Sequence, residues 1–121
     1  MKLLRLSSLI LMLFICSSEP VSGLSMKEYL EYEKESPALL EFYLRGLLNG
    51  FLFSNTQLDY ENRRPIYCPP GKLALTSANL RQLVADYYSN VSPEVKARDF
   101  ETNGSFDVRA LNALIKAFPC K

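Results

Sequence analysis

Apolar residues recur at helical spacing through most of the chain beyond residue 24, and polar stretches separate the runs. Intervals of three and four residues place side chains on one face of an α-helix, whereas a half-buried strand alternates every second residue. Strict alternation over six or more residues occurs nowhere after residue 23. The pattern therefore predicts an all-α fold, a small bundle of four main helices with short helical turns.

Capping residues set the limits of the first two helices. Ser25, with Glu28 three positions later, forms a capping-box pattern that predicts a helix over 26–34. Ser36 followed by Pro37 predicts the start of the next helix, because proline suits the first helical position. The apolar positions of that second helix are Leu40, Leu44, Leu47 and Phe51, widened by Tyr43, Leu48 and Leu52. A helix that is apolar almost all round is expected to be central.

Two glycines share one face of this second helix. Gly46 and Gly50 lie one turn apart, although each costs about 1 kcal/mol relative to alanine in a helix interior. We expect them to permit close helix packing. The neighbouring helix would come either from the same domain or from a second copy of the chain.

The later half of the chain is divided by proline, glycine and polar clusters. An ordered loop is expected within 54–76, followed by a helix that is capped by Thr76 or Ser77 and ends at Asn90 in the left-handed conformation. A short helical turn is expected over 93–99 and a polar break over 101–104. The last helix is expected over 106–118, with Ser105 as its cap.

Residues 1–23 have the pattern of a secretory signal peptide. Two basic residues precede an apolar run over 9–15, and Pro20–Gly23 supplies small residues at the expected cleavage site. The run is shorter than the about 20 residues that a membrane-spanning helix needs. We favour cleavage after Gly23 over lipid attachment at Cys16, because Ile15 is not the small residue that a bacterial lipid-attachment site prefers there. Residues 24–121 then form a single exported domain.

Charge and composition narrow the class of function. Residues 24–121 hold 12 basic and 12 acidic residues, and a neutral domain lacks the basic surface typical of binding to nucleic acids or anionic membranes. The chain has no histidine to act as a base or metal ligand. No nucleophile–base pair or metal-ligand cluster is recognisable either. We therefore expect a protein-binding protein that is not an enzyme and uses no cofactor or metal.

Cys68 and Cys120 are the two cysteines that follow the leader, and each lies beside proline. An even number of cysteines in a small exported domain indicates a disulfide. Joining them closes a loop of about 53 residues, which the chain-entropy relation values at about 4 kcal/mol. The alternatives are a free thiol, a catalytic cysteine and a metal ligand, and the last two commonly need histidine partners.

Four motifs follow one another across residues 41–120: Gly46-x-x-x-Gly50, Pro65-Ile-Tyr-Cys-Pro-Pro-Gly71, Leu73-x-Leu-Thr-x-x-x-Leu80 with Tyr87-Tyr88, and Ala110-Leu-x-x-x-Ile-x-x-Phe-Pro-Cys120. This succession resembles the Rap/Tai immunity proteins of Gram-negative bacteria. The resemblance implies a small periplasmic helical protein with a disulfide at these two cysteines. It also implies a dimer that binds a type VI secretion amidase effector and obstructs its active-site cleft.

The motifs assign no inhibitory residue, so the candidates come from loops held on the scaffold. The first loop is Asp99–Gly104, where Phe100 is expected to fill a pocket of the partner and Glu101 or Asn103 to occupy polar subsites. The second is 59–64, with Arg63 and Arg64. The alternative is that both are ordinary solvated connections, with Phe100 folded into the core. The alternative function is a periplasmic binding or chaperone-like module with another partner.

Overall fold

The computed structural model describes residues 23–102 and 104–121, so most of the predicted signal peptide, including Cys16, lies outside the described residues. The described helices are α2 (Met26–Glu35), α3 (Pro37–Tyr60), α4 (Ser77–Ser89), α5 (Pro93–Glu101) and α6 (Phe106–Ala117). Within these ranges the extended pairing is limited to an isolated bridge between Ser25 and Ser105. The predicted all-α fold is confirmed.

Side chains cap α2 and α4 as predicted, whereas Ser36 and Ser105, which precede α3 and α6, make no capping hydrogen bond. The Ser25 hydroxyl accepts a hydrogen bond from the Glu28 N–H at 3.1 Å, and the Ser25 N–H donates to the Glu28 carboxylate at 2.9 Å. These hydrogen bonds from Ser25 hold the pKa of Glu28 below its usual value. Thr76 caps α4 in the same reciprocal way with Asn79. The predicted helix starts at residues 26 and 77 are therefore correct.

One predicted helix exit is wrong. Asn90 has φ −91° and ψ 0°, which is right-handed backbone, and its side chain donates to the Asp86 carbonyl at 2.8 Å. The left-handed conformation occurs instead at Asn62, with φ 55°, just after α3. Asparagine tolerates this region, and the turn at Asn62 reverses the chain at the far end of α3.

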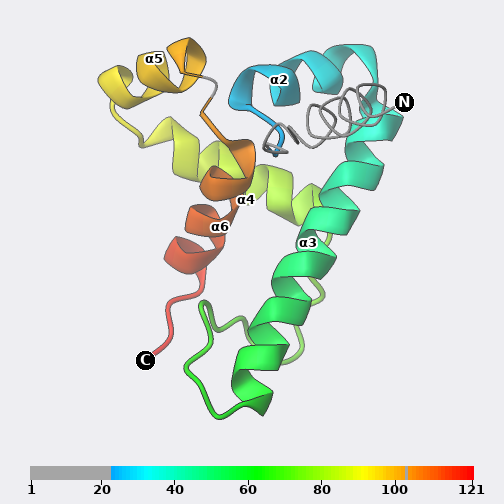
Figure 1. The fold of residues 1–121 in the computed structure, drawn as a ribbon, viewed down its shortest axis with the longest axis vertical. Helices are drawn as coiled ribbons and strands as arrows, with labels where there is room; N and C mark the ends of the chain where they lie inside the picture. The colour runs from blue at the N-terminus through cyan, green and yellow to red at the C-terminus, as the bar shows by residue number, and fades with distance from the viewer. Residues whose placement is uncertain (1–22, 103) are drawn as a thin grey trace, which may run out of the picture.

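Helix α3 runs along the length of the molecule, and the other elements lie mainly on one side of it (Figure 1). Helices α4 and α6 pack most extensively against each other, and α3 contacts both α2 and α4. The loop over 61–76 returns from the end of α3 toward the C-terminal end of α6 (Figure 1). This loop and α5 therefore lie at opposite ends of the molecule.

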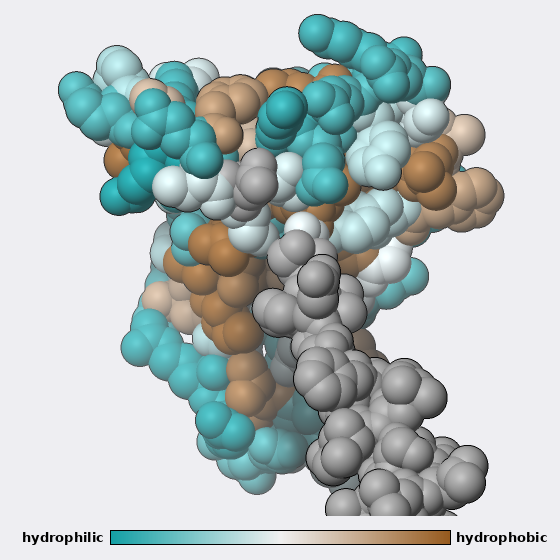
Figure 2. All heavy atoms as spheres, turned by 45° about the horizontal axis from the view of Figure 1, so that its top comes forward, coloured by the Kyte–Doolittle hydropathy of each residue, from teal (hydrophilic) through white to brown (hydrophobic). Residues whose placement is uncertain are grey.

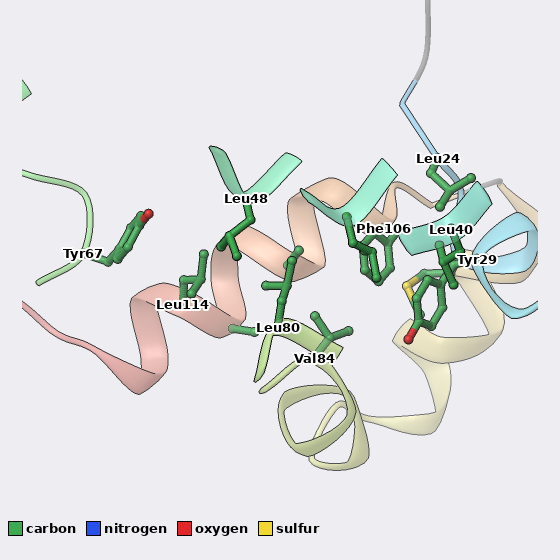
Figure 3. Packing of buried hydrophobic residues seen from close by; sticks show 13 residues of the cluster. Leu24, Tyr29, Leu40, Leu48, Tyr67, Leu80, Val84, Phe106 and Leu114 are labelled. Atoms are coloured by element: carbon green, nitrogen blue, oxygen red, sulfur yellow. The ribbon is translucent and has the colours of Figure 1, made fainter. Parts of the chain in front are cut away.

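One continuous core joins these elements (Figure 3). At one end the rings of Tyr29 and Phe106 stack with centroids 4.2 Å apart and planes 12° from parallel. At the other end the loop after α3 contributes Tyr67, which is fully buried. The buried apolar residues are Leu24, Met26, Tyr29, Leu40, Leu44, Leu48, Tyr67, Leu80, Val84, Phe106, Ala110, Ala113 and Leu114.

The prediction that α3 is central, drawn from its almost continuous apolar circumference, is not met. The helix buries one face, through Leu40, Leu44 and Leu48, and leaves apolar residues exposed on another. The physical reason is the small number of partners. Helix α3 has 24 residues, whereas its main neighbours α2 and α4 have 10 and 13. Two short helices cannot enclose the whole circumference of a long one.

Candidate functional site

The predicted disulfide is present. Cys68 and Cys120 are bonded, with their Cα atoms 5.0 Å apart. A backbone hydrogen bond from the Cys68 N–H to the Phe118 carbonyl, at 2.8 Å, lies beside the bond. The disulfide fastens the loop after α3 to the end of α6. Because both sulfurs are committed to this bond, the expected role of the cysteines as scaffold is supported and a free thiolate is not formed.

Asn55 is a structural polar residue that the sequence interpretation missed. Its side chain is buried on α3 and makes three hydrogen bonds to the loop backbone. The amide donates to the Tyr67 carbonyl at 2.7 Å and accepts from the N–H groups of Ile66 at 2.7 Å and Tyr67 at 3.3 Å. Asn55 lies seven residues after Leu48, and this spacing places it on the same buried face of α3. That spacing was the sequence signal that could have predicted its burial.

The corner between α5 and α6 differs from the predicted open loop over 99–104. Helix α5 continues to Glu101, so Asp99 lies within the helix and is only 3 % exposed. The Asp99 carboxylate accepts two hydrogen bonds from the Arg109 guanidinium of α6, at 2.8 and 2.6 Å. These hydrogen bonds raise the pKa of Arg109 above its usual value. Asp99 is thus occupied within the domain and does not present a carboxylate to a partner.

Gly104 closes the same corner. Its N–H donates to the Asp99 carbonyl at 2.7 Å, and its carbonyl accepts from the Met26 N–H at 2.8 Å. A Cβ at position 104 would lie 2.8 Å from the Cα of Asp99, so only glycine fits without a shift of the backbone. The turn is therefore held by tight backbone packing as well as by the ion pair.

Phe100 and Glu101 are the predicted contact residues that the structure leaves accessible at this corner. Phe100 is 43 % exposed, so the alternative that it folds into the core is not met. Glu101, the last residue of α5, is also exposed. Asn103 lies outside the described residues. The structure therefore brings an exposed aromatic side chain and a carboxylate next to buried Asp99 and its partly buried partner Arg109.

The second predicted set, Arg63 and Arg64, belongs to the loop after α3, which lies at the opposite end of the molecule from α5 (Figure 1), so it does not join Phe100. Arg64 donates to the Cys120 carbonyl at 3.1 Å, so it ties the loop to the C-terminus. Arg63 forms an exposed ion pair with Glu61 at 3.7 Å. An exposed pair of this kind contributes little stability, and Arg63 stays accessible for binding.

An exposed apolar row on α3 is a third candidate surface. We call it the α3 open face and define it by Leu39, Phe42, Gly46, Gly50 and Phe53. The two phenylalanines are each 73 % exposed. Apart from the adjoining backbone of α3 itself, no described residue lies within 4 Å of the position that a Cβ would take at either glycine. The predicted close packing of another helix at Gly46 and Gly50 therefore does not occur within the described domain, and packing with a second copy stays a prediction.

Hydrophobic surface is also visible between hydrophilic areas in the space-filling view (Figure 2). A hydrophobic area on a small protein often marks a contact with another protein.

Residues 23–102 and 104–121 contain no cluster of acidic and cysteine side chains suited to a metal ion. Within the same ranges, no helix has the length and apolarity required to cross a membrane.

Comparisons of the chain with protein-family models, with curated proteins and with solved structures give no match. The resemblance to the Rap/Tai immunity proteins therefore stays a prediction from the sequence motifs.

Proposed function

We propose that this chain is an exported inhibitor that binds a peptidoglycan amidase delivered by type VI secretion and covers its active-site cleft. The motif resemblance suggests this target. The observation that carries the proposal is the corner between α5 and α6, where exposed Phe100 and Glu101 stand beside the partly buried Asp99–Arg109 pair. The disulfide is consistent with the periplasm, because such bonds persist in oxidising compartments.

The corner has the physical properties of an inhibitory contact. An aromatic side chain supplies a large apolar area, and such anchors commonly dominate the binding energy of an interface. Holding the anchor on a rigid support lowers the entropy that must be lost on binding. The support here is the pair of hydrogen bonds between Asp99 and Arg109 together with the close packing of Gly104.

The test begins with the biological role. A strain lacking the gene is exposed to attack by its siblings, and the purified protein is used to capture peptidoglycan hydrolases. We expect the mutant to be killed and an amidase to be captured. Survival equal to that of the parent strain, together with no captured hydrolase, rejects the proposal.

The binding corner is tested separately with Phe100→Ala. Loss of a dominant anchor worth at least 2 kcal/mol is expected to weaken amidase binding about 30-fold or more, with little change in melting temperature. Leu73→Ala is the matched control, because Leu73 is 44 % exposed and lies in the loop after α3. Equal effects of the two variants on binding would place the contact elsewhere.

We also propose that the α3 open face binds a second copy of the chain. The residues that define it carry no charge, so two identical faces meet without like-charge repulsion. Gly46 and Gly50 lie between Phe42 and Phe53, close to the midpoint of the row. An antiparallel two-fold pairing then directs Phe42 of each copy toward Phe53 of the other, and the glycines allow the backbones to approach.

The same face favours the second candidate function, a chaperone-like module, if no dimer forms. Sedimentation of the wild-type protein and of Gly46→Leu separates the two cases. We expect a wild-type dimer that Gly46→Leu converts to a monomer, while Gly71→Leu leaves it dimeric because Gly71 is open and outside α3. A wild-type monomer that binds unfolded apolar peptides through Phe42 and Phe53 supports the chaperone-like function.

A further inference from the structure

The segment Leu24–Met26, which we call the strap, connects the start of the described chain to α6. The Phe106 N–H donates to the Leu24 carbonyl at 2.7 Å, and the Met26 N–H donates to the Gly104 carbonyl at 2.8 Å. Leu24 and Met26 are buried, and Leu24 lies at the same end of the core as Leu40 and Phe106 (Figure 3). The strap is therefore part of the folded domain, although it directly follows the predicted cleavage site.

The backbone nitrogen of Leu24 lies in a polar site formed by side chains of α3 and α6. It donates to the Tyr43 hydroxyl of α3 at 3.0 Å, and that hydroxyl donates to the Asp107 carboxylate of α6 at 2.6 Å. Among residues 23–102 and 104–121, Asp107 forms no ion pair with a lysine or arginine. A carboxylate thus stands one hydrogen bond beyond the Leu24 nitrogen without a cationic partner in the described chain.

The surroundings of this nitrogen are acidic. The charged or titratable groups around it are Asp107 from α6, Glu28 and Tyr32 from α2, and Tyr43 from α3. The cavity beside Leu24 is lined by described residues that include Glu28 and Tyr32 but no lysine or arginine. Such a site suits a positive charge better than the uncharged N–H of a peptide bond.

Gly23 passes against the same carboxylate. A Cβ built at position 23 would overlap the Asp107 Oδ2 atom. Gly23 therefore lies directly against Asp107, and only glycine fits there in this arrangement. Removal of residue 23 would leave room for the Leu24 nitrogen to reach Asp107 directly.

We propose that hydrolysis of the Gly23–Leu24 peptide bond creates an α-ammonium group on Leu24 that pairs with Asp107, hydrogen-bonds to Tyr43 and fixes the strap onto α6. In this step water adds across the peptide bond. Its oxygen becomes part of the Gly23 carboxylate, and the Leu24 nitrogen takes up protons to become –NH₃⁺. The hydrolase is of the signal-peptidase class, so the proposal rests on the export signal and not on inhibition of an amidase.

The pairing would connect processing to the candidate binding corner. The strap holds the Gly104 carbonyl, and Gly104 in turn packs on Asp99. A chain that still carries residues before Leu24 lacks the ammonium and its ion pair. The corner between α5 and α6 is therefore held most firmly in the processed protein.

The proposal gives a definite dependence on pH. An α-amino group has an unperturbed pKa of about 7.7–8.0, and a neighbouring carboxylate raises it in the folded state. A raised pKa of a cationic group gives stability that is complete below the unfolded value and is lost as pH rises through the folded value. Tyr43 stays neutral in this window, because burial and the hydrogen bond to Asp107 raise its pKa to about 12.

The experiment uses the mature protein purified from the periplasm, with its disulfide intact. Mass spectrometry first locates its N-terminus, which we expect at Leu24. Acetylation confined to the α-amine then removes the charge without altering any side chain. We expect acetylation to lower the melting temperature at pH 7 by about 4–8 °C and to have no effect at pH values above the folded pKa of the amine.

Asp107→Asn completes the comparison. Acetylation is expected to change the melting temperature of this variant little, whereas it lowers that of Glu31→Gln as in the wild type, since Glu31 is an exposed carboxylate of α2. Tyr43→Phe, which removes only the hydroxyl, is expected to reduce the effect partly. An N-terminus other than Leu24, no effect of acetylation at pH 7, or an equal effect in Asp107→Asn overturns the proposal.

Discussion

Replacement of Asn55 by alanine tests whether one buried amide holds the loop after α3 in place. In the native protein this side chain makes three hydrogen bonds to the backbone of Ile66 and Tyr67. Asn55→Ala removes all three and leaves the loop N–H and carbonyl groups without these partners. The change adds no new polar group and suits the helix, because alanine has the highest helix propensity.

The expected cost follows from the burial of the groups left behind. Tyr67 is fully buried, so its N–H and carbonyl cannot readily bond to water, whereas Ile66 is 41 % exposed and its N–H can. A buried polar group without a partner costs about 1–3 kcal/mol, so two such groups, partly offset by the gain in helix propensity, suggest a loss of about 2–4 kcal/mol. This is a large part of the roughly 5–15 kcal/mol that stabilises a typical domain.

Urea unfolding of the oxidised protein measures this loss. Asn49→Ala is the matched control, because it changes the same residue type at an exposed position of α3. An exposed substitution of this kind is expected to change the free energy of unfolding by no more than about 0.5 kcal/mol. If Asn55→Ala is no more destabilising than Asn49→Ala, the loop is not held by Asn55 and the reasoning fails.

Three further predictions concern other parts of the fold. Replacing Cys68 and Cys120 together by serine is expected to lower the free energy of unfolding by about 4 kcal/mol, and a loss under about 1 kcal/mol in urea contradicts the chain-entropy argument. Burial is the main cause that raises the pKa of Tyr29 from 10.0 to about 12, so its neutral form gives stability that is complete below pH 10 and lost toward pH 12. Tyr29→Phe should therefore raise the pH midpoint of alkaline unfolding, and an unchanged midpoint argues against this. Gly104→Ala is expected to cost about 1–3 kcal/mol through overlap with Asp99, whereas Gly71→Ala, in open space, should have little effect on melting temperature.

Local signals in the sequence were sufficient for the helices and the disulfide. Ser25 and Thr76 cap α2 and α4, because a cap needs only its own side chain and the first helical turn. Ser36 precedes α3 without a capping hydrogen bond, and Pro37 at the first helical position marks that start. The two cysteines could be paired because residues 24–121 hold no others. The caps depend on residues close in the sequence and the disulfide on the number of cysteines, so neither prediction requires knowledge of how the helices pack.

The surroundings of α3 and α5 could not be predicted in this way. The apolar pattern of α3 does not say how many partners exist to cover it, so Phe42 and Phe53 were not recognised as exposed. Aspartate is common in loops, so the residue type of Asp99 did not indicate burial. It is buried because its carboxylate accepts hydrogen bonds from Arg109, ten positions later. Contacts between distant segments decide the burial of these residues, and periodicity does not record them.

The position of the disulfide also determines how the protein responds to force. Tension applied between Leu24 and Lys121 cannot extend the chain enclosed by Cys68 and Cys120, because the covalent bond carries the load. The extensible part is about 47 residues, which reach roughly 160 Å when fully stretched, against roughly 340 Å for all 98 residues after reduction. In the oxidised protein α4, α5 and α6 lie inside the closed loop, so stretching removes α2 and α3 while these three helices remain connected as a unit.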